Sequence, residues 1–425
     1  MTSYAGSAER RSEVGMFDLV DDCRICGSAD LRPVLDLGSQ PLANSLRRES
    51  TEVLEEIPLD LVFCGSCQTP QLTATVDPAE LFRHYVWVTG TARTTHAYSV
   101  EFRDRIIGIT EAASVGRPTI VEVASNDGTF LRRFQEAGWQ VLGVDPAENI
   151  ASKAQKDGIP TRCDFFDRTI ADDIRAENGP ADVVVARNVI PHVRAIHSIL
   201  DGISALVAED GVAVIEFHSA DRIVKELHYD SIYHEHLFYF SLTTLLSLCA
   251  RYGLHAFDVF DSPISGGSRV LSFSRSKRKL TAELRRGLEA EEAMGLGMYE
   301  TWQRFGEESL RHARSLADVV FDRAKRSPVI GYGASARSST MLNFAGIRSP
   351  EVMAVIDQNP GKQGLLTPGT DIPIVSRSDG LPLLGDDGVV LLLAWNFADE
   401  ILGDLRTDGV HCDVIVPLPG RVRTV

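Results

Sequence analysis

The sequence reads PTIVEVASNDGT from Pro118 to Thr129. The first half is a short apolar run rich in β-branched residues, which is typical of a buried strand. The second half is a turn that leads into a helical pattern. A second strand, Gln140 to Val144, ends on Asp145, about 20 residues beyond the first. This order of strand, turn, helix, strand and acid predicts a Rossmann-like α/β domain that binds a nucleoside.

The scarcity of glycine in this turn indicates which nucleoside fits. Ala124 and Asn126 stand where a dinucleotide-binding turn carries glycines, which a pyrophosphate needs for close backbone approach. An adenosine without phosphates does not need them, so S-adenosylmethionine is favoured over NAD. We expect Asp145 on the ribose, Asn126 to Gly128 near the methionine moiety and an aromatic ring beside the adenine; a generic turn and core packing of that ring are the alternatives. The predicted cofactor contacts are Glu122, Ser125, Asn126, Asp127, Gly128, Asp145 and Phe166.

A polar cluster lies further along the chain and reads Asp230-Ser231-Ile232-Tyr233-His234-Glu235-His236. Histidine exchanges protons near neutral pH, a carboxylate can orient its ring, and a phenol can hold an oxygen. Asn188 and His192 follow one expected strand, and the cluster follows another, so all should reach the ligand-binding edge of the sheet. A solvated loop without a role is the alternative. The His-x-His spacing differs from the i, i+4 pair of a helical metal site.

Four cysteines near the N-terminus form two C-x-x-C pairs, Cys23 with Cys26 and Cys64 with Cys67. Two such pairs can complete a tetrahedral four-thiolate shell around Zn²⁺. A closed shell leaves no position for water, so the expected zinc is structural. The gap between the pairs is longer than in a simple zinc ribbon, which requires a small subdomain within it.

Composition bounds the possible partners. The 425 residues indicate two or three domains, and the net charge of −16 argues against non-specific binding to nucleic acid or to an anionic membrane. No apolar run approaches the ~20 residues of a membrane span. Residues 1–20 lack the apolar core of a signal peptide, so we expect a cytoplasmic protein.

The C-terminal part has the pattern of a second Rossmann-like domain. Helical spacing runs from Lys279 to Arg326 with a break at Gly295 and Gly297, and the strand-and-turn run Pro328 to Ala336 follows. We expect an anion-binding helix N-terminus near Ser335 and Ala336. The predicted α/β architecture is therefore a zinc-binding domain at 20–80, a methyltransferase domain at 81–275 and a C-terminal Rossmann-like domain at 276–425.

Taken together, these motifs resemble the three-domain sugar-nucleotide C-methyltransferases of deoxysugar and antibiotic biosynthesis, such as the C-3 enzymes of the tetronitrose and mycarose pathways. The matching runs span residues 23 to about 401 in one order: the cysteine pairs, LGSQPLAN from Leu37, EVASNDG from Glu122, ARNVIPH from Ala186, IYHEH from Ile232, GGS from Gly266, GYGA from Gly331, KQG from Lys362 and AWN from Ala394. The resemblance implies a zinc-binding domain, an S-adenosylmethionine domain and a C-terminal domain that helps to hold a nucleotide-sugar.

The resemblance also implies that Tyr233, Glu235 and His236 are active-site residues, with His236 as the base. Tyr85 lies in a linker similar to one that contributes a substrate-contacting tyrosine, but Trp87 and Ala92 depart from the family pattern of Tyr-x-Tyr followed by serine. These departures leave the sugar open.

The expected chemistry is carbon methylation beside a ketone. His236 would remove an acidic proton next to the carbonyl of a 4-keto sugar, Tyr233 would stabilise the oxyanion, and Glu235 would orient His236. Asn188 and His192 would contact the substrate. An O- or N-methyltransferase and a non-catalytic nucleotide-sugar binder remain as alternatives. The sequence leaves open the nucleotide, the methylated carbon, the stereochemistry and whether the chain is a monomer or a homo-oligomer.

Overall fold

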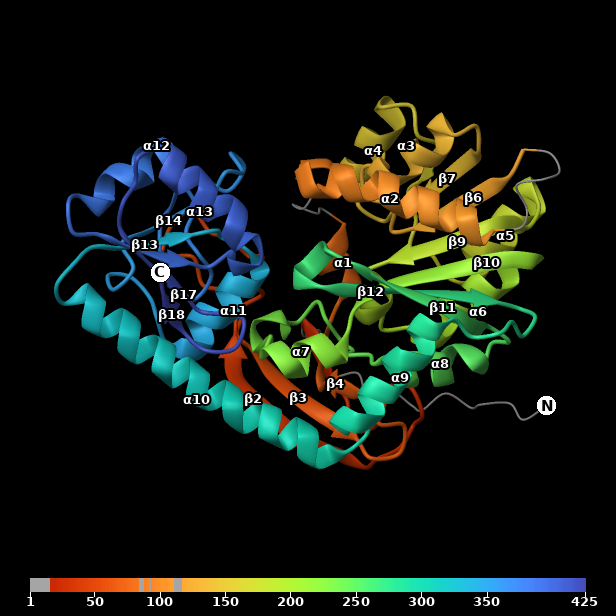
Figure 1. Cartoon of the computed structure of the whole chain (residues 1–425), viewed down its shortest axis with the longest axis horizontal. Coiled ribbons are helices and arrows are strands. Elements are labelled where there is room, and N and C mark those ends of the chain that lie inside the picture. The colour runs from red at the N-terminus through yellow and green to blue at the C-terminus, as the bar shows by residue number, and fades with distance from the viewer. Residues whose placement is uncertain (1–15, 84–87, 92, 111–116) are drawn as a thin grey trace.

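The computed structural model describes residues 16–83, 88–91, 93–110 and 117–425, which form an N-terminal β unit and two α/β units (Figure 1). Trp87 and Ala92, the two departures from the family pattern, lie outside these ranges, as does Tyr85. Among the described helices, none has the length and apolarity needed to cross a membrane. The mixed α/β architecture expected from the sequence is confirmed.

The N-terminal unit is a small antiparallel sheet with a two-stranded ribbon beside it. The sheet has the order β2-β3-β4, and β1 pairs with β5. Leu35 and Leu37 of β2 and Leu59 and Leu61 of β3 are buried, because alternate residues of a strand point to the same face. The elements are β1 (Phe17–Leu19), β2 (Leu31–Gln40), β3 (Ile57–Cys64), β4 (Pro70–Leu72), β5 (Ala74–Val76) and α1 (Pro78–Phe82).

The central unit is a seven-stranded sheet with the order β11-β12-β10-β9-β6-β7-β8. β12 runs antiparallel to both neighbours, and the strands from β10 to β8 are parallel. The strands are β6 (Thr119–Val123), β7 (Gln140–Val144), β8 (Thr161–Arg162), β9 (Ala181–Arg187), β10 (Val207–His218), β11 (His255–Ser262) and β12 (Ser268–Ser274). The helices are α2 (Arg93–Ile109), α3 (Thr129–Glu136), α4 (Glu148–Lys156), α5 (Arg168–Asn178), α6 (Ile196–Leu206), α7 (Ala220–Glu226) and α8 (Leu242–Ala250), with 3₁₀ turns η1 (Thr89–Thr91), η3 (Ile190–His192), η4 (Tyr229–Ser231) and η5 (Ile264–Gly266).

The C-terminal unit is a six-stranded sheet with the order β15-β14-β13-β16-β17-β18, parallel except for β18. Gly295, at φ +67°, ends the first of the two helices that lead into it, at the break expected from the sequence. The helices are α9 (Ala282–Met294), α10 (Tyr299–Ala324), α11 (Ala336–Ala345), α12 (Arg377–Gly380) and α13 (Ala398–Thr407). The strands are β13 (Val329–Tyr332), β14 (Ala354–Ile356), β15 (Ile374–Val375), β16 (Val389–Leu392), β17 (Asp413–Val416) and β18 (Arg423–Thr424), with 3₁₀ turns η6 (Leu381–Leu384) and η7 (Trp395–Phe397).

Helix α10 joins the units. It runs along the base of the molecule beside β2 and β3 and ends in the C-terminal lobe (Figure 1). Gly306 lets the helix approach β2, because a Cβ there would lie 2.1 Å from the carbonyl oxygen of Val34. One apolar core then continues from Leu61 and Phe305 through Tyr229 and Ile232 into the C-terminal sheet.

Each α/β unit has a point where its strand order reverses. In the central sheet the reversal lies between β6 and β9, and in the C-terminal sheet it lies between β13 and β16. Ligands of open α/β sheets bind outside the carboxyl ends of the strands at such points. The predicted cofactor turn follows β6, and the predicted anion site follows β13.

Candidate active site

The four cysteine thiols converge as the sequence predicts. All four Sγ atoms lie within 4.8 Å of one another, with Cys23 3.5 Å from Cys67 and Cys26 3.6 Å from Cys64. A tetrahedral zinc with bonds of about 2.3 Å requires sulfur separations of about 3.8 Å, so the residues fit the ion. Gln71 Nε2 donates to Cys23 Sγ over 3.0 Å, which supplies an outer hydrogen bond to a ligand.

The zinc site lies beside the polar cluster predicted to be catalytic. Leu72 N–H donates to the carbonyl of Leu237, and Tyr239 N–H donates to the carbonyl of Pro70, both over 3.0 Å. Gln71 and Phe238 form the antiparallel bridge between these bonds. The strand that follows the second cysteine pair therefore holds the segment that follows His236.

The cofactor turn has the backbone shape that its sequence requires. Ala124, Asn126 and Gly128 have φ of +53°, +51° and +74°. A Cβ on Gly128 would meet Ile159 at 2.9 Å, so glycine is needed there. Asp145, at the end of β7, accepts from the backbone N–H of Asn126 over 2.8 Å and of Ala147 over 2.9 Å. Its carboxylate thus braces the turn from the position where a ribose acceptor is expected.

The segment before α2 caps the same turn. Thr89 N–H donates to the side-chain oxygen of Asn126 over 2.9 Å, and Gly90 N–H donates to Asp127 Oδ2 over 3.3 Å. A Cβ on Gly90 would lie 2.7 Å from Asp127 Oδ2, so the close approach requires glycine. The linker noted in the sequence thereby reaches the cofactor turn.

Ser125 and Phe166 remain predicted cofactor contacts. The Ser125 hydroxyl is buried and has no hydrogen-bond partner in the described part of the chain. Phe166 is 8% exposed and packs in the core on one side of the central sheet, whereas Phe165 is 42% exposed. Phe165 is therefore the more accessible ring of the pair, although its neighbour was the sequence-based choice.

Glu122 forms part of a buried charge cluster across three strands. Arg187 Nε donates to Glu122 over 2.7 Å, and Arg187 Nη1 lies 3.8 Å from Glu216. The Arg187 guanidinium carbon lies 3.3 Å from the ring centroid of Phe130. Burial raises the pKa of Glu122 to about 7, against the lowering effect of Arg187, and also raises the pKa of Glu216. Burial therefore favours the protonated form of both carboxyl groups.

Two rings of the polar cluster that are predicted to be catalytic, those of Tyr233 and His236, lie against each other. The ring centroids of Tyr233 and His236 lie 4.0 Å apart, and His192 meets His236 edge-on at 4.6 Å. His236 Nδ1 lies 2.7 Å from the carbonyl oxygen of Ser231. Because a carbonyl only accepts, Nδ1 carries the hydrogen and Nε2 carries the lone pair.

The orientation of His236 differs from the sequence-based expectation. The group that fixes its ring is the backbone carbonyl of Ser231, whereas the carboxylate of Glu235 accepts from Asn44 Nδ2 over 2.5 Å. Neighbours in a tight turn project in different directions, which adjacency in sequence does not reveal. Asn44 belongs to the N-terminal unit, and sequence reasoning missed it as a site residue. The sequence did point to Asn44, because this residue ends the family-matching run LGSQPLAN that begins at Leu37.

Burial keeps the three rings of the site uncharged. Burial lowers the pKa of His236 well below its usual value, and the nearby His192 lowers it further. Burial lowers the pKa of His192 to about 4, and burial raises the pKa of Tyr233. At neutral pH both imidazoles are therefore neutral and the phenol is protonated. This combination provides a proton acceptor and a proton donor side by side.

The predicted substrate contacts fall at the same sheet edge. Asn188 follows β9 with φ +50°, and its N–H donates to the carbonyl of Glu216 over 2.7 Å. His192 lies in η3, and its buried Nδ1 has no partner among the described residues. Tyr85 lies outside the described residues, so its role stays a prediction.

The C-terminal unit supplies a second polar turn. Ser335 caps α11 in a capping box with Ser338, and Lys362 Nζ donates to the carbonyl of Ala334 over 2.6 Å. A small cleft brings these residues together with Asn44 of the N-terminal unit. Asn44 therefore lies between the polar cluster and the start of α11.

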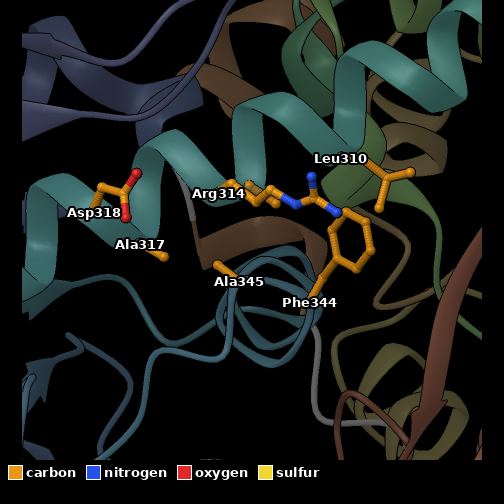
Figure 2. Close-up of a pocket in the computed structure, with 7 residues that line it drawn as sticks. Leu310, Arg314, Ala317, Asp318, Phe344 and Ala345 are labelled. Atoms are coloured by element: carbon orange, nitrogen blue, oxygen red, sulfur yellow. The ribbon is translucent and has the colours of Figure 1, made fainter.

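A larger cavity of about 200 Å³ lies between α10 and α11. Figure 2 shows Arg314 and Asp318 on α10 facing Phe344 and Ala345 at the end of α11. None of its lining residues belongs to the predicted site, and it lies at the opposite end of α11 from Ser335.

Three family models match successive parts of the chain. A zinc binding domain matches residues 23–82, a methyltransferase domain matches 96–258, and a C-methyltransferase C-terminal domain matches 263–419. The C-methyltransferase NovU of Streptomyces niveus is 33% identical over 415 residues, covering 94% of this chain and 96% of NovU.

Solved structures overlap part of the chain. Magnesium protoporphyrin IX methyltransferase of Synechocystis PCC 6803, with bound SAM, is 12% identical with a TM-score of 0.32, covering 43% of this chain and 81% of that one. The plantazolicin methyltransferase BpumL, in complex with SAH, is 14% identical with a TM-score of 0.33, covering 43% and 84%. The assignment rests on the family models and on NovU. The chain belongs to the three-domain family of S-adenosylmethionine-dependent C-methyltransferases that includes NovU.

Proposed function

We propose that the enzyme methylates a carbon beside the ketone of a nucleotide-linked 4-keto-deoxysugar, with a dTDP-linked sugar methylated at C-3 as the specific form. The observation that carries the proposal is the pairing of His236 and Tyr233. His236 presents a lone pair on Nε2, because its Nδ1 donates to the Ser231 carbonyl. Tyr233, whose ring lies against it, keeps its phenolic proton. A neutral base beside a neutral donor suits the removal of a proton next to a carbonyl.

In the proposed reaction, His236 Nε2 takes the proton from C-3, and the C–H electron pair forms an enolate with the C-4 oxygen. Tyr233 donates to that oxygen, which stabilises the developing charge. S-adenosylmethionine supplies an electrophilic methyl group. The enolate carbon forms the new C–C bond as the S–CH₃ bond breaks, and the ketone re-forms. His192 and Asn188 would hold the sugar in this reaction.

The position of Asn44 supports a nucleotide-linked substrate. Asn44 contacts Glu235 and also lines the cleft with Ser335 and Lys362. A helix N-terminus and a lysine suit a diphosphate, and the polar cluster suits a sugar. A single extended ligand would therefore span the C-terminal and central units past Asn44. The proposal includes a role for the C-terminal domain in holding the nucleotide-sugar. It also includes the domain boundaries at residues 80 and 275.

The test is solvent exchange of the sugar proton. Enzyme, S-adenosylhomocysteine and a dTDP-4-keto-deoxysugar are mixed in heavy water, and deuterium at the carbon beside the ketone is followed by mass spectrometry and NMR. His236→Ala should lower this exchange, and methylation in a parallel assay with S-adenosylmethionine, by a factor on the order of 10²–10⁴, while S-adenosylmethionine affinity measured by calorimetry stays unchanged.

His234→Gln is the matched control, since His234 Nε2 donates to the carbonyl of Ile57 and an amide can keep that bond. It should stay within a few-fold of the wild type. Wild-type exchange in His236→Ala would remove His236 as the base. A product methylated on oxygen or nitrogen would overturn the carbon assignment.

A further inference from the structure

Asp230 is a fully buried carboxylate that contacts another domain. Its Oδ2 accepts from Trp395 Nε1 over 2.8 Å and from Arg337 Nε over 3.1 Å. Its Oδ1 accepts from Arg337 Nη2 over 2.8 Å. Asp230 has no exposed side-chain surface, so these bonds replace water around the charge. All three donors come from the C-terminal unit.

The same residue lies directly before the group that orients the predicted base. Asp230 is the middle residue of η4, and the next residue, Ser231, presents the carbonyl that accepts from His236 Nδ1. The Ser231 hydroxyl donates to the carbonyl of His228 over 2.7 Å, which holds the turn from within. The direction of the Ser231 carbonyl therefore depends on how this turn is held.

The partners of Asp230 belong to the predicted nucleotide end of the C-terminal sheet. Arg337 is the second residue of α11 and lies two positions after the Ser335 cap, and Trp395 begins η7 after β16. The Arg337 guanidinium carbon lies 4.6 Å from the Trp395 ring centroid. Gly266 makes room for both, because a Cβ there would lie 3.3 Å from each of them.

We propose that Asp230 is a positioning residue for His236, held by Arg337 and Trp395. The proposal rests on the proposed role of His236 as the base. Its physical basis is orientation. A buried carboxylate bound at both oxygens allows only one placement of its turn, and the Ser231 carbonyl is one residue away. An ion pair of this kind contributes little net stability compared with apolar packing, so specific placement is the better reason for its presence.

Asp230→Asn tests the proposal because it keeps the shape of the side chain and removes its charge. We expect kcat and the deuterium-exchange rate to fall at least tenfold, while KM for a dTDP-4-keto-deoxysugar stays within about twofold. Tyr229→Phe is the matched control. It removes a hydrogen bond of 3.1 Å to His312 at the same domain boundary, one residue away, and should stay within twofold in every measurement.

A spectroscopic readout separates positioning from general damage. In enzyme labelled with ¹⁵N-histidine, the wild-type His236 signal, assigned by its loss in His236→Ala, should report a proton on Nδ1. Asp230→Asn should shift that signal toward a mixture of tautomers, and Tyr229→Phe should not. Where Asp230→Asn fails to fold, Trp395→Phe replaces it, since it removes one donor and keeps a ring.

The outcomes distinguish the two proposals. Wild-type kcat and an unchanged tautomer in Asp230→Asn, or in Trp395→Phe as its replacement, would overturn the positioning role while His236 remains the base. Equal losses in Asp230→Asn and Tyr229→Phe would also overturn it, because the effect would then belong to the whole boundary. Wild-type exchange in His236→Ala would overturn the proposed function itself.

Discussion

The chemistry of a single residue depends on hydrogen bonds to residues that are not its neighbours in the sequence. The family resemblance predicts His236 as the base, and the structure adds that its Nδ1 donates to the Ser231 carbonyl. Glu235, which adjacency in sequence suggested as its partner, instead accepts from Asn44, 191 positions away. Residue types could therefore be predicted from the sequence, whereas the pairing between them could not.

The carboxylate pair beside Arg187 makes stability depend on pH. Burial raises the pKa of Glu122 from 4.5 to about 7, so the folded state binds a proton more tightly than the unfolded state. The stability that this proton contributes is fully present below pH 4.5 and is lost as the pH rises to about 7. The free energy of unfolding should fall across this window by an amount on the order of 3 kcal/mol.

Glu122→Gln carries no titrating proton and should lack this slope. Denaturant unfolding of both proteins from pH 4.5 to 8 measures the difference. Glu136→Gln, at an exposed position, is the control and should follow the wild type. Parallel pH curves for the wild type and Glu122→Gln would show that folding does not raise the pKa of Glu122.

At the scale of elements, the strands and helices follow the sequence closely. The apolar runs at Ile120, Val141, Val183 and Val390 are strands, because short continuous apolar runs rich in β-branched residues favour the buried strands of a parallel sheet. No pattern in the sequence predicts the backbone pairing between β4 and residues 237–239. It joins short segments about 165 positions apart, and only tertiary packing brings their backbones together.

This ladder predicts a local effect of zinc removal. Metal analysis should find about one zinc per chain. Chelation, or Cys67→Ser, should speed hydrogen exchange in peptides that cover residues 237–240, because Tyr239 N–H donates to Pro70 just after the second cysteine pair. Peptides from β16 in the C-terminal sheet should exchange as in the zinc-loaded protein. A zinc-free protein with unchanged exchange at 237–240 would contradict this coupling.

At the scale of the whole molecule, three units meet at residues 228–239. The N-terminal unit contacts this segment through Asn44, Ile57 and Leu72, and the C-terminal unit contacts it through Arg337 and Trp395. The net charge of −16 would oppose the anionic nucleotide-sugar of the proposed function, whose binding would require local cations and backbone donors. Lys362 and the N-terminus of α11 line one cleft and would supply them in the proposed function.

Lys362→Met should therefore weaken dTDP binding by about tenfold, which corresponds to about 1.4 kcal/mol. S-adenosylmethionine affinity should not change, because that ligand is expected at the other sheet. Calorimetry with each ligand measures both. Lys277→Met, at an exposed position in the loop after β12, is the control. An equal loss for both ligands would place Lys362 outside a dedicated nucleotide site.

The sequence by itself determined the four converging thiols, the two Rossmann-like patterns, the turn predicted to bind the cofactor and the polar cluster predicted to be catalytic. These are local features, since each depends on residue types at short spacing, where sterics and side-chain chemistry act directly. Tertiary structure alone decided that Asn44 contacts Glu235, that Ser231 orients His236 and that Asp230 binds Arg337 and Trp395. Such contacts join residues of different domains or opposite sides of a turn. Their geometry follows from how the packed units meet, and no spacing along the chain records it.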